Sequence, residues 1–274
     1  MRSSLLFIVV ALASTAAFDK RSDLIIGGTR ALQGQFPFHV RFVYERLQSG
    51  QFNVCGGTLL SDRHVLTAAH CLANTHPKGG YAIAYFGLVD KDAVEGDGVQ
   101  SVPIKTVTMH PNNPTGNHTY DDIAVLELES PVKFTKFVKP IKVVLNDDDL
   151  IKAPTGGIVI GFGVTSYSNK AAGPRSEYLL YAQVPFVDHE LCKARYGWKV
   201  TETTICADTN GKGVGEGDSG GPLAVVSQNE WIQVGITSWT TRTENRKRNP
   251  SVYTRISKYC DFIKEATGKS VQCS

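Results

Sequence analysis

The sequence predicts an all-β fold, either a barrel or a sandwich. Short apolar or alternating segments recur along the chain, separated by clusters of Gly, Pro, Asn and Asp, which is the pattern of strands joined by turns. Only one segment, near the C-terminus, has the apolar spacing of a helix. The composition, with 42% hydrophobic residues and 26 glycines, excludes a disordered, collagen-like or coiled-coil chain.

The expected strands follow one another from Ile25 onward. Each is a short alternating or apolar run bounded by turn residues. They cover residues 38–44, 56–60, 64–67, 123–128, 157–163 and 232–236. The proline-bounded segment 130–140 is the expected connection between two halves of the chain.

A single helix is expected over about residues 256–267. Its apolar residues recur at i, i+3, i+4 and i+7, and Gly268 supplies a stop signal. They are Ile256, Tyr259, Cys260, Ile263 and Ala266.

The N-terminal segment has the order of a secretory signal peptide. Arg2 precedes the apolar run Leu5–Ala13, and small residues follow as far as Ala17. We therefore predict a signal peptide over 1–17 and a secreted, extracellular protein. The apolar run is well short of the ~20 residues that span a bilayer. With 29 Lys and Arg against 26 Asp and Glu, the net charge of +3 indicates neither a nucleic acid nor a membrane partner.

Six cysteines in a secreted chain predict disulfides, although counting alone does not choose the pairing. The cysteines form no C-x-x-C spacing and no His cluster accompanies them, so no zinc site is predicted. Asn117-His118-Thr119 is the single N-x-[ST] match, and Asn117 is a predicted glycosylation site.

Three short segments carry residues suited to nucleophilic catalysis. They are Thr67-Ala68-Ala69-His70-Cys71, Asp122-Ile123-Ala124-Val125 and Gly217-Asp218-Ser219-Gly220-Gly221-Pro222. In these motifs, and in the chain order His, Asp, Ser, the sequence resembles the trypsin and chymotrypsin family of serine endopeptidases. The resemblance extends from Ile25 to the terminal helix.

The resemblance implies two antiparallel six-stranded Greek-key β-barrels with a C-terminal helix. Residues 25–274 would form the peptidase domain, with the first barrel over about 25–138, the second over about 139–256 and the helix at the end. The substrates would be proteins or peptides, protein protease inhibitors would be partners, and the chain would be a monomer.

The catalytic roles have a chemical reason. A serine hydroxyl is a weak nucleophile at neutral pH and needs a base that takes its proton and returns it to the leaving amine. Ser219 and His70 fit these roles, and a buried carboxylate, Asp122, would fix the imidazole tautomer. By resemblance, the amides of Gly217 and Ser219 form the oxyanion hole, and Ser238 supports the catalytic carboxylate.

Asp218, next to the nucleophile, needs a cationic partner if it is buried. Ile25-Ile26-Gly27-Gly28 resembles the new amino terminus that the family creates on activation. Cutting the Leu24–Ile25 bond would release an activation peptide, 18–24, and an α-ammonium to pair with Asp218. Leu24 stands where trypsin-activated zymogens carry Arg or Lys, so the activating protease is left open.

The residues at the family's specificity-pocket positions are small or neutral. Gly213 and Val214 stand at the pocket base, and Thr240 and Ser251 at its walls, where glycines are usual. The acid that would attract Lys or Arg is missing. The resemblance therefore implies cleavage after small-to-medium apolar residues. If the pocket accepts leucine, the enzyme could cut its own Leu24–Ile25 bond.

The resemblance also implies the disulfides Cys55–Cys71 and Cys192–Cys206. Cys260 and Cys273 have no counterpart in the common pattern and are paired by elimination, with an intermolecular link or a free thiol left open. The basic loop 241–249 would either favour acidic residues in extended substrates or simply be solvated.

No metal or cofactor is predicted. Leu88 follows Gly87, where calcium-binding trypsins carry glutamate, so Asp90, Asp92, Glu95 and Asp97 are interpreted as a solvated loop. One alternative is a catalytically silent, protease-like binding protein, which would typically have lost a triad or oxyanion residue. Another, a secreted esterase or lipase, is disfavoured because its order would be Ser, acid, His.

Overall fold

The computed structural model describes most of the chain from Ile25 to the C-terminus. The described ranges are 25–45, 50–73, 81–93, 98–118, 120–152, 155–168, 171–207, 212–241 and 249–274. The predicted signal and activation peptides, Leu24 included, lie outside the described residues. So do Glu95, Asp97, Thr119 of the glycosylation motif and residues 242–248 of the basic loop. Among the described helices, none has the length and apolar character needed to cross a bilayer.

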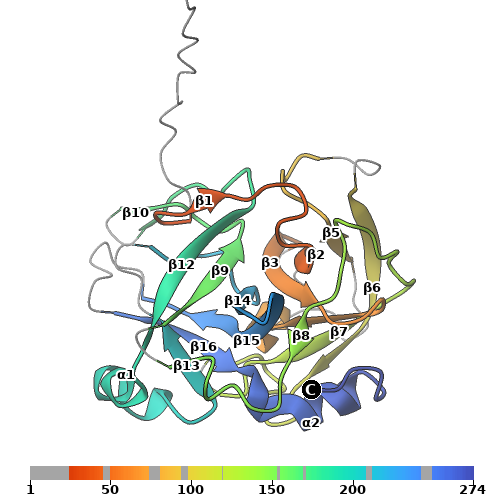
Figure 1. Cartoon of the computed structure of the whole chain (residues 1–274). Helices are drawn as coiled ribbons and strands as arrows, with labels where there is room; N and C mark the ends of the chain where they lie inside the picture. Colours follow the sequence, from red (N-terminus) through yellow and green to blue (C-terminus); the bar gives the residue numbers. More distant parts are fainter. Residues whose placement is uncertain are drawn as a thin grey trace, which may run out of the picture.

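Six antiparallel strands close the first barrel in the order β2-β3-β4-β7-β6-β5 (Figure 1). Along β2, alternate side chains such as Phe42 point into the barrel and are buried, because successive residues of a strand face opposite sides. The strands are β2 (His39–Glu45), β3 (Phe52–Leu59), β4 (His64–Thr67), β5 (Ala82–Phe86), β6 (Gln100–Met109) and β7 (Ala124–Leu128).

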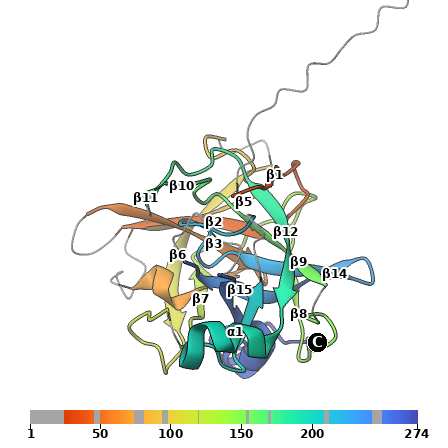
Figure 2. The ribbon, with the colours of Figure 1, turned by 90° about the vertical axis from the view of Figure 1, so that its left-hand side faces the viewer.

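Six more strands close the second barrel, in the order β9-β12-β13-β16-β15-β14, since β14 pairs with β9. They are β9 (Gly156–Gly161), β12 (Leu180–Val187), β13 (Thr204–Ala207), β14 (Pro222–Ser227), β15 (Glu230–Trp239) and β16 (Ser251–Arg255). The fold prediction of two six-stranded antiparallel barrels is therefore confirmed. Figure 2 shows the same barrels from the side.

Four short strands of the described chain lie outside the two barrels. They are β1 (Thr29–Arg30), β8 (Lys142–Val143), β10 (Tyr167–Ser168) and β11 (Ala171–Ala172). β1 pairs with Leu180 and Tyr181 of β12, so the start of the described chain lies on the second barrel. The strands of the first barrel begin with β2, after this N-terminal segment.

The predicted C-terminal helix is present as a turn of 3-10 helix, η4 (Ile256–Tyr259), followed by α2 (Cys260–Ala266). A further helix, α1 (His189–Tyr196), was not predicted. Cys192 is the one buried residue of this helix, so its sequence lacks the apolar periodicity that predicts a helix. Its one sequence signal is Asp188, whose carboxylate caps the first turn by accepting from two backbone N–H groups.

Three disulfides join elements around the two barrels. Cys55–Cys71 links β3 to the short helix η1 (Ala69–Leu72), and Cys192–Cys206 links α1 to β13. Cys260–Cys273 ties the start of α2 to the C-terminal tail. All six cysteines are therefore paired within the chain.

His39 is a fully buried titratable group at the start of β2. Neither ring nitrogen has a hydrogen-bond partner in the described part of the chain, and the ring lies 5.8 Å from that of Phe162, centroid to centroid. Burial, assisted by the nearby charge of Arg41, lowers the pKa of His39 to about 3. The imidazole is therefore neutral in the folded protein at physiological pH.

We expect this histidine to make the fold acid-sensitive. An unfolded histidine has a pKa near 6.5, so from there down to about pH 3 the unfolded chain binds one more proton at this site than the folded chain. The free energy of unfolding should fall as the pH falls, by up to about 1.4 kcal/mol per pH unit from this group. Urea denaturation between pH 7 and pH 4 measures the slope.

The His39→Gln variant should have a shallower dependence of the free energy of unfolding on pH, because glutamine does not titrate. His189→Gln, which removes a half-buried imidazole from α1, is the matched control and should keep the parent slope. Equal slopes for the parent and His39→Gln would contradict the prediction.

Candidate active site

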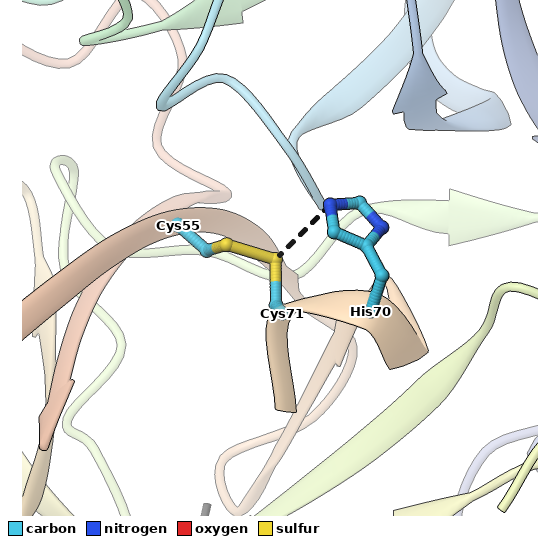
Figure 3. A group of neighbouring side chains, drawn as sticks. All are labelled: Cys55, His70 and Cys71. Atoms are coloured by element: carbon cyan, nitrogen blue, oxygen red, sulfur yellow. Dashed lines mark hydrogen bonds between the residues drawn. A yellow bond between two sulfur atoms is a disulfide. The ribbon is translucent and has the colours of Figure 1, made fainter. Parts of the chain in front are cut away.

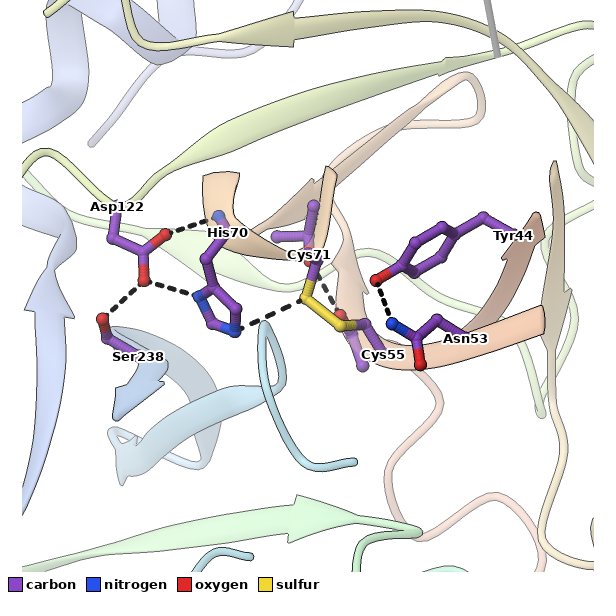
Figure 4. Close-up of a disulfide and its surroundings, with 9 residues drawn as sticks. Tyr44, Asn53, Cys55, His70, Cys71, Asp122 and Ser238 are labelled. Atoms are coloured by element: carbon purple, nitrogen blue, oxygen red, sulfur yellow. Dashed lines mark hydrogen bonds and ion pairs between the residues drawn. A yellow bond between two sulfur atoms is a disulfide. The ribbon is translucent and has the colours of Figure 1, made fainter. Parts of the chain in front are cut away.

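His70 lies in η1, the turn that follows β4 of the first barrel, and Asp122 lies just before β7. The ring Nδ1 of His70 is 2.7 Å from Asp122 Oδ2, and the backbone N–H of His70 donates to Oδ1 at 2.8 Å. The hydroxyl of Ser238, on β15 of the second barrel, also donates to Oδ2 (Figure 4). These bonds hold the imidazole in one orientation, with Nε2 directed away from the carboxylate.

Asp122 remains ionised although its side chain is only 2% exposed. Burial alone would raise its pKa, but the charge of His70 and hydrogen bonds from His70 and Ser238 together hold the pKa below its usual value. The neighbouring Asp121 faces elsewhere and accepts a hydrogen bond from the Tyr259 hydroxyl at 2.8 Å. Only Asp122 is therefore placed to orient His70.

Ser219 comes from the loop before β14, and this loop packs against the first barrel. Its carbonyl accepts from Gly56 N at 2.8 Å. The next residue, Gly220, has φ +78°, and a Cβ there would lie 2.1 Å from Thr67 Oγ1. Thr67 lies three residues before His70, so a side chain at position 220 would collide with the segment that carries the histidine. A glycine is therefore required where the two barrels meet.

The structure does not join Ser219 to His70 by a hydrogen bond. His70 Nε2 lies 3.9 Å from the disulfide sulfur of Cys71 (Figure 3). Catalytic hydrogen bonds are often long in unliganded enzymes and shorten when substrate binds. Cys55, Cys71 and His70 bring potential ligand atoms together, but both sulfurs are tied in the disulfide and offer no thiolate to a metal.

The backbone beside Ser219 has the character of an anion site. The N–H groups of Gly217 and Ser219 donate to no group in the described ranges. Asp218, 1% exposed, is held by the N–H groups of Gly163 at 2.7 Å and Gly215 at 2.8 Å. Its fixed side chain sets the path of the loop, and so the direction of the two available N–H groups.

A cavity of about 130 Å³ opens beside Ser219. Of the predicted pocket residues, Val214 and Thr240 line it, whereas Gly213 and Ser251 do not. Ser251 acts on the wall indirectly, since its hydroxyl donates to Thr240 Oγ1 at 3.0 Å. Gly213 instead pairs with the N-terminal segment, since its N–H donates to Ile26 O at 3.0 Å.

Sequence analysis did not assign several residues that the structure places around this cavity. The exposed Glu216 lies at the lining, and its N–H donates to the Tyr167 hydroxyl at 2.9 Å. Trp239 and His118 also line the cavity. Glu216 and Trp239 adjoin the recognised motifs and could have been noted, but Tyr167 is distant in sequence and carries no signal.

The cavity, the carboxylate-bound histidine and the serine in its glycine-rich loop define a serine endopeptidase built at the junction of two β-barrels. Comparison with known proteins gives the same class. The sequence profile of the trypsin family matches residues 25–263. A venom protease of Bombus pensylvanicus is 32% identical over 253 residues, covering 89% of this chain and 100% of the venom protease. The chain belongs to the trypsin family.

Proposed function

We propose that this endopeptidase cleaves peptide bonds through an acyl-enzyme formed on Ser219. The observation that carries the proposal is the hydrogen-bonded series from Ser238 through Asp122 to His70 Nδ1, which leaves Nε2 to act as the base. His70 would take the proton of Ser219 as the hydroxyl attacks the scissile carbonyl, then give it to the leaving amine. Water would release the acyl group by the same path in reverse.

The developing negative charge on the carbonyl oxygen would be bound by the amides of Gly217 and Ser219. Their N–H groups have no partner in the described ranges, so they can donate to the oxyanion without breaking a hydrogen bond. A donor fixed in this way is worth roughly 3 kcal/mol in the transition state.

The protein would be secreted as a precursor and activated by cutting Leu24–Ile25. Ile25 is fully buried, and Ile26 pairs with Gly213, so this segment lies against the loop that leads to Asp218. A new α-ammonium on Ile25 would form an ion pair with the buried Asp218 carboxylate. Secretion is also supported by the signal-peptide pattern at 1–17 and by the similarity to a venom protease.

Substrates would be cut after small-to-medium apolar residues. The cavity is small and Val214 contributes an apolar surface, while the hydrogen bond from Ser251 fixes the β-branched Thr240 at the wall. Among the described residues that line the cavity the one acid is Glu216, and its side chain is exposed. An exposed acid there would interact with neighbouring substrate residues more than with the residue before the cut.

The Thr240→Gly variant should accept larger residues. Removing the wall side chain should raise kcat/KM for cleavage after Phe relative to Ala by about 10-fold or more, because each added methylene in such a pocket is worth ~1–3 kcal/mol. The Thr240→Ser variant keeps the hydroxyl and should shift the ratio less. Initial rates on peptides varied at the residue before the cut measure this, using chains cleaved after Leu24.

The same peptides test the proposal as a whole. Cleavage after Leu, Met or Ala that disappears in Ser219→Ala is the expected result, and cleavage after Arg or Lys would contradict the pocket assignment. Failure to hydrolyse any peptide or bind a serine-directed covalent probe, with Ile25 exposed, would favour the silent binding protein. As a monomeric protease the chain would also bind protein inhibitors, and Asn117, which is exposed, would carry a glycan.

A further inference from the structure

His118 lies directly beside His70. The centroids of the two imidazole rings are 4.1 Å apart, and their planes are inclined by 32°. His118 is exposed, whereas the side chain of His70 is 7% exposed. The reaction proposed above uses only His70, so the second imidazole has no role in it.

The backbone that carries His118 is firmly held. The buried Asn113 donates to the carbonyls of Asn117 and Tyr120, both at 2.7 Å, and its Oδ1 accepts from Asn117 N at 2.6 Å. Gly116 has φ +69°, and a Cβ there would lie 2.8 Å from Ala69 O in the turn that contains His70. The loop is thus packed against that turn, and His118 keeps its place beside His70.

The electronic state of the two rings suits a metal ion. Asp122 binds Nδ1 of His70, so the unshared pair of His70 lies on Nε2, and a carboxylate behind a ligand histidine is the usual outer contact of zinc sites. His118 carries a second imidazole, and a neutral imidazole is the commonest metal ligand in proteins, so its ring can also donate an electron pair.

We propose that His70 and His118 form a reversible zinc site that inhibits the enzyme. The candidate ligand atoms of His70, His118 and Asp122 all lie within 4.8 Å of one another. With Asp122 engaged at Nδ1, the ion binds His70 Nε2 and one ring nitrogen of His118, and water completes its coordination. The two ring planes are inclined by 32°, so the exposed His118 ring turns about its side-chain bonds to direct an electron pair at the same ion.

Zinc bound at Nε2 prevents His70 from accepting the proton of Ser219. The inhibitory effect therefore rests on the proposed function, whereas binding of the ion does not. Two imidazoles favour Zn²⁺, Cu²⁺ or Ni²⁺ over Ca²⁺ or Mg²⁺, which prefer oxygen ligands. Calcium is accordingly the control ion.

The binding test uses the full-length Ser219→Ala chain, which needs neither activation nor activity. Calorimetric titration with ZnCl₂ should show a saturable site that CaCl₂ neither fills nor blocks. Adding His118→Ala or His118→Gln should weaken zinc binding by at least about tenfold, equivalent to ~1.4 kcal/mol. His189→Ala, which removes an imidazole from α1, should bind zinc as the parent does.

Zinc binding in the two His118 variants that matches the parent would overturn the proposal. So would the absence of a saturable site. Circular dichroism of each variant establishes that it is folded, and the glutamine variant guards against local collapse of the loop.

The functional test measures peptide hydrolysis by the chain cleaved after Leu24, with each variant referred to its own rate in EDTA. Zinc should inhibit the parent, and His118→Gln should raise the inhibitory concentration at least about tenfold. Equal inhibition of both would overturn the inference. Zinc binding in the calorimeter by a chain that hydrolyses no peptide would support the site and contradict the proposed function.

Discussion

Replacing Ser219 by alanine is expected to lower kcat/KM for peptide hydrolysis by roughly 10⁶-fold. The variant has no hydroxyl to form the acyl-enzyme, and His70 is left with no nucleophile to activate, so the members of the triad fail together. Substrate binding should persist, because the cavity is lined mainly by other residues. Initial rates with a peptide that has Leu before the cleaved bond measure the loss of catalysis. The dissociation constant of the same peptide shows whether substrate binding persists.

Ser227→Ala, at the far end of β14, is the matched control and should retain the parent rate. A Ser219→Ala protein that hydrolyses the peptide within tenfold of the parent would contradict the assignment of the nucleophile. The same variant tests self-activation. A pure Ser219→Ala precursor that is still cut at Leu24–Ile25 as fast as the parent precursor would show that another protease performs the activation.

Replacing Asp122 by asparagine is expected to lower kcat by about 10⁴-fold with little change in the fold. The asparagine amide can donate to Nδ1 of His70, where the carboxylate now accepts. His70 would then carry its proton on Nε2 and could not take one from Ser219. The rate at saturating substrate measures the effect, and the free energy of unfolding shows whether the loss is catalytic.

Asp121→Asn provides a close comparison, because Asp121 is adjacent in sequence but binds the Tyr259 hydroxyl instead of His70. This variant should keep kcat within a fewfold of the parent. If both asparagine variants lost activity equally, the distinction between the two acids drawn from the geometry would be wrong.

The two barrels contribute different parts of the proposed site. His70 and Asp122 belong to the first, whereas Ser219 and the supporting Ser238 belong to the second. The contact between them includes backbone approach at Gly220 and Gly56. Side chains also join the barrels, since the Thr58 hydroxyl on β3 donates to Gln233 Oε1 on β15 at 2.7 Å and apolar residues of both barrels share one core. Changes at Gly220 or Gly56 should therefore shift the nucleophile relative to the base.

Sequence patterns predicted the strands that alternate clearly or that carry a motif. The expected segments 38–44 and 64–67 correspond closely to β2 and β4, and the segment 232–236 is the centre of β15. No specific prediction covered β5, β6, β12, β13, β14 or β16. Three of these strands, β13, β14 and β16, have consecutive buried residues on both faces, so the period-two pattern is weak there. Helix α1 was missed for the opposite reason, since it is almost wholly exposed.

The sequence by itself determined the class of protein, because the His, Asp and Ser motifs and their order are local and depend on few residues. Only the tertiary structure decided how those motifs meet and what surrounds them. It placed Tyr167 and Glu216 at the cavity and the ring of His118 against that of His70. These neighbours depend on the closure and packing of both barrels, and such long-range contacts leave no periodic pattern in a single chain.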